Sequence, residues 1–151
     1  MATANPYANL DLTVPDDLHA DVRRFTWRHR EDGQQSDIDK APFERMVDVW
    51  WSGFCIGVAE GVKETESKKT KFITGVVLND DPDRIRTLQL VALADTGEPT
   101  ILKEPGSVVR IANDFAAAGV RILVDRLNKS TAGPLWDAVD MMKDIAKSDA
   151  Q

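Results

Sequence analysis

The sequence predicts a mainly α-helical protein, a compact bundle of about five helices with one or two short extended segments. Apolar residues recur at three- and four-residue spacing over long stretches, which is the helical period. Prolines suited to a first helical turn open several of these stretches, at Pro15, Pro42, Pro82 and Pro134. Strand-like patterns are confined to residues 10–14 and 72–78. The class is therefore mainly α.

The length of 151 residues fits one domain, with 42% hydrophobic and 29% charged residues. A chain of this size buries enough surface to fold without a metal or a disulfide. We expect a single helical domain over residues 10–147. Residues 1–9 and 148–151 are expected to be flexible termini.

Two patterns predict the first elements: apolar and polar residues alternate in a strand, and apolar residues then recur at the helical period. Residues 10–14, LDLTV, alternate apolar and polar side chains and predict a short strand. Pro15, followed by acidic residues, predicts a helix to about His29. Residues 31–40 are expected to form a polar loop.

The most apolar stretch, residues 42–62, predicts the central helix, with Trp50 on its buried face. Glycines stand four apart along this helix, at Gly53, Gly57 and Gly61. Each mid-helix glycine costs about 1 kcal/mol relative to alanine. We therefore expect the backbone of another helix to pack on this stripe, with the small residues from Ala116 to Gly119 as its counterpart.

Further helices follow the polar connector at 63–71 and the extended segment at 72–78. Asp81 is the expected N-cap of a helix that runs to about Asp95 and is buried nearly all round over residues 88–94. Ser107 is the expected N-cap of a helix over residues 108–127. The last helix begins at Pro134, and its expected inward residues are Leu135, Val139, Met142 and Ile145 or Ala146.

Charge and cysteine content restrict the partners and the compartment. The net charge of -6 and the pI near 4.9 oppose general nucleic-acid binding, which depends on neutralising phosphates. One cysteine cannot form an internal disulfide and fits a reducing compartment. The N-terminus has no secretory pattern, and no apolar stretch reaches the roughly 20 residues that cross a bilayer. We expect a cytoplasmic protein without membrane contact.

The first helix carries the basic region of this acidic chain. A solvated surface with acidic neighbours is the favoured interpretation of its arginines. They are also the candidates for nucleic-acid or anion contact: Arg23, Arg24, Arg28 and Arg30. The segment LDLTVPDDLHADVRRF also resembles the opening of ribbon-helix-helix repressors, whose paired strands enter the major groove. Asp11 would then face phosphates, which opposes that interpretation.

No catalytic signature occurs, so we expect no enzyme activity, no cofactor and no metal. Phosphate-binding glycine loops and the HExxH, CxxC and GxSxG patterns are absent. Cys55 with His19 or His29 as base is a conceivable nucleophile, but its apolar neighbours indicate an inert core thiol. Three aspartates within residues 80–83 are explained by helix capping better than by metal binding.

Three tryptophans fall outside the apolar line of their predicted helices. They are Trp27, Trp51 and Trp136, whereas Trp50 lies on its line. Exposed tryptophan is enriched at interaction sites. The alternative is that each packs under a polar loop. We expect a protein partner or a homo-oligomer.

Residues 43–127 resemble the small accessory proteins encoded beside Dnd-type DNA phosphorothioation clusters and related bacterial antiphage loci. The resemblance is carried by the turn Ala92-Leu93-Ala94-Asp95-Thr96-Gly97, by Ile101-Leu102, and by Asn113-Asp114-Phe115-Ala116 to Gly119. These are packing and turn motifs. The resemblance implies an accessory role in DNA modification or defence and supplies no catalytic residue.

Two functions from different classes follow. The first is a non-catalytic accessory or adaptor protein of a bacterial DNA-modification or antiphage system, acting through protein contacts. The alternative is a small DNA-binding transcriptional regulator that uses the basic first helix. The acidic pI favours the adaptor.

We expect no appreciable binding to duplex DNA at about 150 mM salt, because net repulsion outweighs a small basic patch. Fluorescence anisotropy with a labelled duplex, over a salt series, measures this. Micromolar or tighter binding that an Arg24→Glu, Arg28→Glu double variant abolishes would instead support the regulator.

Overall fold

The computed structural model describes residues 4–27, 41–130 and 133–149. Helices dominate, which confirms the mainly α class, and two short strands form a small antiparallel sheet. The elements, in chain order, are β1 (Asp11–Pro15), α1 (His19–Arg24), α2 (Met46–Glu60), β2 (Lys69–Thr74), α3 (Pro82–Thr96), α4 (Pro105–Asn128) and α5 (Pro134–Asp149).

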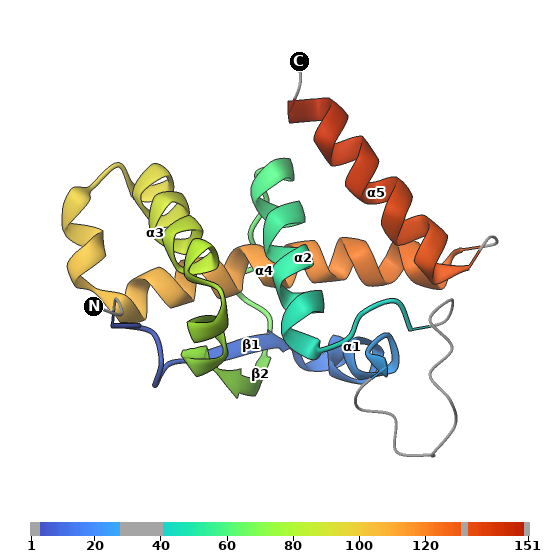
Figure 1. Ribbon diagram of the computed structural model, residues 1–151, viewed down its shortest axis with the longest axis horizontal. Coiled ribbons are helices and arrows are strands. Elements are labelled where there is room, and N and C mark those ends of the chain that lie inside the picture. Colours follow the sequence, from blue (N-terminus) through green and yellow to red (C-terminus); the bar gives the residue numbers. More distant parts are fainter. Residues whose placement is uncertain (1–3, 28–40, 131–132, 150–151) are drawn as a thin grey trace.

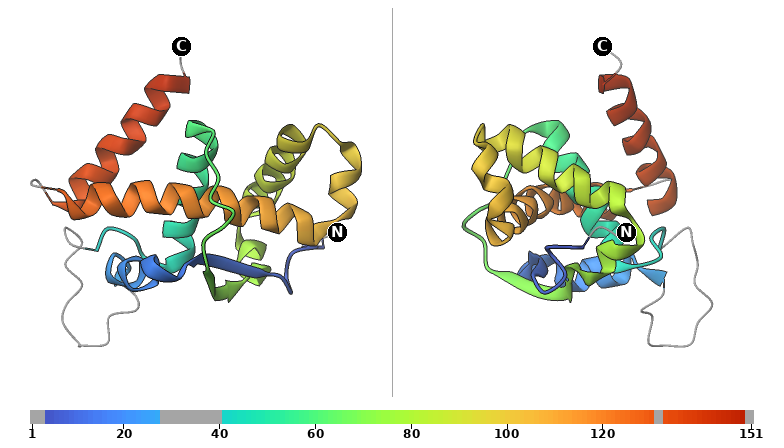
Figure 2. Two further views of the ribbon diagram at one scale, coloured as in Figure 1. Left: turned by 180° about the vertical axis from the view of Figure 1, so that it is seen from behind. Right: turned by 60° about the vertical axis from the view of Figure 1, so that its left-hand side comes forward.

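The long helix α4, with 24 residues, is the axis of the molecule (Figure 1). Helix α2 crosses it near its middle, and strand β1 lies against it. Helix α3 packs beside its N-terminal half, and α5 leaves from its C-terminal end (Figure 2). Helix α4 therefore contacts α2, β1, α3 and α5.

The crossing of α2 and α4 is a contact between backbones. A Cβ on Gly119 would overlap the carbonyl oxygen of Gly53, and a Cβ on Gly57 would overlap that of Phe115. A Cβ on Gly53 would lie 2.7 Å from the backbone nitrogen of Val120. Glycine is required at these positions because no side chain fits between the helices. The small-residue contact predicted by the glycine spacing is thus formed by Gly53, Gly57 and Gly119.

The prediction was wrong for Gly61, which touches no other helix and ends α2. Its φ is 67°, in the left-handed region, and nothing lies within 4 Å of where its Cβ would be. Helix α2 also begins at Met46 rather than at Pro42. Phe43 instead exchanges backbone hydrogen bonds with Phe25 and Trp27, which holds the chain extended before the helix.

Strand β1 forms where alternation predicts it, and it pairs with β2. The second strand was predicted at 72–78, but β2 takes in Lys69–Lys71 of the expected connector, and a 3-10 turn replaces its end at Gly75–Asp80. The first helix is also shorter than predicted. After Arg24, the backbone of Phe25 and Thr26 turns to meet Phe43.

Residues 4–9 are attached to the body, which corrects the expectation of a flexible N-terminus there. Tyr7 is 1% exposed. Asn5 donates a hydrogen bond to the carbonyl oxygen of Gly75 at 2.8 Å and another to Asn79. The opposite end also differs, since α5 continues to Asp149.

Helix α3 begins as predicted, with the Asp81 carboxylate accepting a hydrogen bond from the backbone N–H of Arg84. It is not buried all round, however. Within 88–94 only Leu88 and Ala92 are buried, and Leu90 is 66% exposed. The reason is that α3 lies at the edge of the molecule and packs on one side (Figure 2).

Helix α4 begins three residues earlier than predicted, at Pro105, and Ser107 lies inside its first turn. In α5 the buried residues are Ala138 and Met141, and of the predicted inward residues only Ile145 packs, half-buried, against the core. Leu135, Val139, Met142 and Ala146 instead line a groove, described below. No helix in the described ranges is long and apolar enough to cross a lipid bilayer.

Gly119→Ala is expected to lower the free energy of unfolding by about 2 kcal/mol or more, because the new methyl group must push α2 away from α4. Urea unfolding measures this. Gly106→Ala in the same helix is the matched control. Nothing lies within 4 Å of a Cβ there, so its stability should be unchanged or slightly raised. Equal stability of the two variants would contradict the close contact.

Candidate functional site

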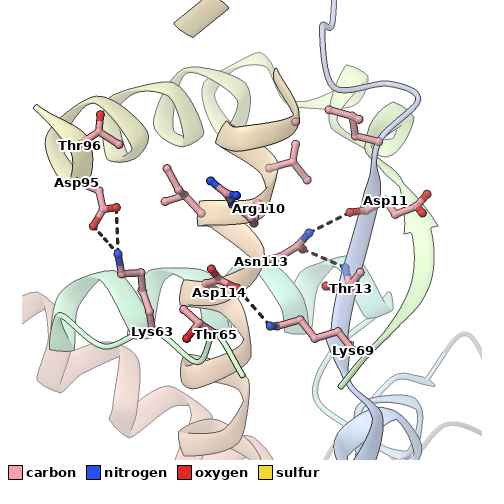
Figure 3. A pocket seen from close by; sticks show the side chains of 14 residues that line it. Asp11, Thr13, Lys63, Thr65, Lys69, Asp95, Thr96, Arg110, Asn113 and Asp114 are labelled. Atoms are coloured by element: carbon pink, nitrogen blue, oxygen red, sulfur yellow. Dashed lines mark hydrogen bonds and ion pairs between the residues drawn. The ribbon is translucent and has the colours of Figure 1, made fainter. Parts of the chain in front are cut away.

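A polar cleft of about 740 Å³ opens beside the N-terminal half of α4 (Figure 3). It is bounded by β1, by the segment that follows α2, by the first residue of β2 and by the end of α3. The side chains in its wall that carry polar groups are Asp11, Thr13, Lys63, Thr65, Lys69, Asp95, Thr96, Arg110, Asn113 and Asp114.

The charges of this cleft are largely paired with one another. Lys63 Nζ lies 3.0 Å from an Asp95 carboxylate oxygen, and Lys69 Nζ lies 3.2 Å from Asp114 (Figure 3). The second pair is shielded, with side chains 16% and 15% exposed. A shielded pair is costly to break because each charge would be left without its partner. These pairs hold the segment after α2 and the start of β2 to the helices.

Asn113 forms the floor of the cleft and joins three elements. Its Oδ1 accepts hydrogen bonds from Trp50 Nε1 at 3.1 Å and from the backbone N–H of Thr13 at 3.0 Å. Its Nδ2 donates to the carbonyl oxygen of Asp11 at 3.0 Å. The side chain is 7% exposed and its amide is satisfied on both sides. A polar residue on the apolar face of α4 was the sequence signal for this role.

The polar groups of the cleft lining mainly connect the elements around it. The lining contains no cysteine or histidine, and its three carboxylates, Asp11, Asp95 and Asp114, are all ion-paired with lysines. Arg110 points from α4 beside these pairs (Figure 3). Elsewhere, burial raises the pKa of the Cys55 thiol, which keeps it protonated and unreactive at neutral pH. Within the described ranges, no group of three or more His, Cys, Asp or Glu is placed to hold a metal ion.

A second polar cluster surrounds Arg121, which lies two helical turns after Asp114 on the same side of α4. The guanidinium donates two hydrogen bonds to Asp17 and two to Glu64, between 2.6 and 3.1 Å. These bonds lower the pKa of both carboxyl groups, although burial acts in the opposite direction, and they raise the pKa of Arg121. The cluster ties the segment before α1 and the segment after α2 to α4.

The candidate nucleic-acid arginines do not assemble into an open patch within the described residues. Arg24 pairs with Asp21 at 2.8 Å, donates a hydrogen bond to Asn128, and lies over the ring of Phe25. Arg23 also interacts within the protein. Arg28 and Arg30, together with His29, lie outside the described residues. Arg24 is therefore used to attach α1 to the end of α4.

The candidate interface tryptophans differ in their surroundings. Trp51 is half-buried, with its ring 5.0 Å from that of Phe54 and the Arg84 guanidinium 5.1 Å above it. Trp27 is also half-buried beside Phe43. Trp136 is 58% exposed on α5. Trp50, expected in the core, is fully buried.

An apolar groove of about 420 Å³ runs between α5 and the segment that precedes α2. Met142 in this groove is 40% exposed. The C-terminal half of α5 stands away from the other helices (Figures 1 and 2). Its lining residues are Pro42, Phe43, Leu135, Ala138, Val139, Met142, Lys143 and Ala146. We call this surface the α5 groove.

Comparison of the chain with models of protein families, with curated proteins and with solved structures finds no match. The functional proposal is therefore argued from the residues of this chain and their geometry.

Arg121→Gln is expected to destabilise the protein by about 1 kcal/mol at pH 7 and much less at pH 3. Asp17 and Glu64 have lowered pKa values in the folded state, so their contribution is present above their unfolded values of roughly 3.9 and 4.3 and is lost as pH falls through the lowered values. Urea unfolding at both pH values measures the difference.

Arg86→Gln is the control for this experiment. Its pair with Asp83 is exposed, with side chains 68% and 86% accessible, so the variant should match the wild type at both pH values. A difference between Arg121→Gln and wild type that is independent of pH would show that the carboxylates contribute nothing through their charge.

Proposed function

We propose that this protein is a non-catalytic adaptor that binds another protein chain along the α5 groove. The observation that carries this proposal is an apolar helix face that the body covers only in part. Met142, at 40%, and Ala146 are exposed, and the other members of the face are half-buried. Leu135, Val139, Met142 and Ala146 recur at helical spacing on one side of α5 and line the groove. Burying apolar surface contributes roughly 25 cal/mol per Å², so an open face of this kind is available for binding.

Stability of the fold does not account for this face. Helix α5 is attached to the body through Ala138 and Met141, which are 8% and 5% exposed, and through the half-buried Ile145. The groove row lies beside these anchors. Trp136, 58% exposed on the same helix, extends the open surface. Large aromatic residues next to an apolar groove are typical of binding hot spots.

The other clusters support a binding role over catalysis. The carboxylates Asp95 and Asp114 are paired with lysines, and the thiol of Cys55 has a raised pKa. Neither arrangement supplies an activated nucleophile or a base poised near neutral pH.

The proposed setting is a cytoplasmic DNA-modification or antiphage system, which follows from the resemblance of residues 43–127. The genes that flank this one test the setting without biochemistry. Flanking genes unrelated to DNA modification or defence would remove the setting and leave the binding role.

Met142→Asp is expected to reduce binding of the cellular partner at least about tenfold, because a charge would be buried in the groove. Tagged full-length protein is expressed in the cells that encode it, and co-purified proteins are quantified by mass spectrometry. Leu90→Asp, at a position 66% exposed on α3, is the matched control.

Both variants should keep the wild-type melting temperature, because both positions face solvent. A partner that is retained by wild type and Leu90→Asp and lost by Met142→Asp supports the proposal. Equal recovery of the same proteins with all three chains would overturn it.

A further inference from the structure

We propose that the polar cleft binds a small organic molecule through one anionic group, a carboxylate or a phosphate monoester, which the guanidinium of Arg110 holds. The cleft lies beside the N-terminal half of α4, whereas α5 leaves from the C-terminal end of that helix (Figure 1). The inference therefore concerns a second site and goes beyond the proposed adaptor function.

Arg110 differs from the other arginines of the described ranges. Each of those forms an ion pair with a carboxylate or, in the case of Arg23, interacts within the protein. Arg110 alone among them bonds to no other described residue, although the chain has 25 acidic residues against 19 basic ones. Its side chain is exposed and lies in the cleft lining, where a ligand can reach it.

The nearest candidate partner on the same helix is already occupied. Asp114 follows Arg110 by four residues, the spacing at which side chains of one helix pair. Its carboxylate is instead held by Lys69 at 3.2 Å, and both side chains of that pair are shielded, at 15% and 16% exposed. Moving Asp114 to Arg110 would leave the shielded lysine without a partner, which is costly.

The other two carboxylates of the cleft are also neutralised by lysines. Asp95 pairs with Lys63 at 3.0 Å, and Asp11 pairs with Lys71 at 3.1 Å. With every acid of the lining matched to a lysine, the positive charge of Arg110 is left in excess. This excess favours an anionic ligand and opposes a cationic one.

The donors of the cleft suit a carboxylate or a phosphate. A guanidinium presents a planar fork of N–H groups that matches two oxygens of either anion. Figure 3 shows the ammonium groups of Lys63 and Lys69 on other sides of the same cleft. An ammonium group has three N–H donors, so a lysine that is paired with one carboxylate keeps donors for a ligand.

The size and the walls of the cleft indicate an organic body behind the anionic group. Its volume of about 740 Å³ lies within the range of roughly 300–1,000 Å³ typical of small-molecule sites. Leu10, Val109 and Ile111 supply apolar lining. Helix side chains lean toward the N-terminus, which directs Arg110 toward the turn of Gly106. A Cβ at Gly106 would meet nothing within 4 Å, so space is open there.

Titration of the full-length ¹⁵N-labelled chain with benzoate and with phenyl phosphate, followed by NMR at about 20 mM salt, tests the site. At least one of the two should bind with a dissociation constant of about 1 mM or tighter. Binding should shift the Nε–H signal of Arg110 and the side-chain amide signals of Asn113. The two probes distinguish a carboxylate site from a phosphate site. Benzamide, the neutral analogue of benzoate, and inorganic phosphate should both bind at least about tenfold more weakly.

Arg110→Gln should weaken binding of the organic anion about tenfold or more, and Arg110→Lys about threefold, because lysine keeps the charge and loses the fork. Arg86→Gln is the matched control. It changes the net charge of the protein equally at a position 68% exposed on α3, outside the cleft lining, so binding should be unchanged. All three variants should keep the wild-type melting temperature, because both positions face solvent.

The proposal is overturned when neither organic anion binds at concentrations up to about 20 mM. Equal weakening by Arg86→Gln and Arg110→Gln would overturn it as well, because binding would then follow the overall charge. Benzamide that binds as tightly as benzoate would remove the anionic contact, and inorganic phosphate that binds as tightly as phenyl phosphate would remove the organic ligand. Shifts that spare Arg110 and Asn113 would place binding outside the cleft. Each of these results leaves the adaptor function of the α5 groove in place.

Discussion

The architecture depends on the direct backbone contact between α2 and α4. At Gly53, Gly57 and Gly119 the two helices approach so closely that no side chain fits between them. Close approach brings long rows of apolar atoms on both helices into contact at once, which is how it offsets the roughly 1 kcal/mol lost at each glycine. With α2 fixed across its middle, α4 holds the sheet and α3 on one half and α5 at its end.

Asn113 sets the rotation of this crossing. One amide binds Trp50 of α2 and two backbone groups of β1, so the sheet and α2 must both be in register with α4 for every bond to form. A buried amide with its partners missing costs about 1–3 kcal/mol. The polar group therefore penalises alternative packings that apolar contacts alone would tolerate. The ion pairs around the polar cleft act at the edge of the same arrangement.

The sequence predicts those elements whose signals are local. The Asp81 cap, the helical class and strand β1 follow from residues that are neighbours in the chain. The glycine contact was also predictable. Each glycine within α2 lowers helix stability, and that loss is offset only where a second helix with small side chains packs closely against it. The start of α2 was not. Phe43 has the correct helical spacing, but its backbone pairs with Phe25 and Trp27, a contact that no local pattern contains.

The face of α5 illustrates the same limit with a functional consequence. Helical spacing identifies Leu135, Val139, Met142 and Ala146 as an apolar row, and a single sequence assigns such a row to the core. In the folded chain α5 starts beside the C-terminal end of α4. It therefore meets the body along Ala138 and Met141, which lie on the face of α5 next to that row. Two adjacent apolar sides on one helix are more than attachment to α4 requires. This second apolar side is the surface that we propose binds another protein chain.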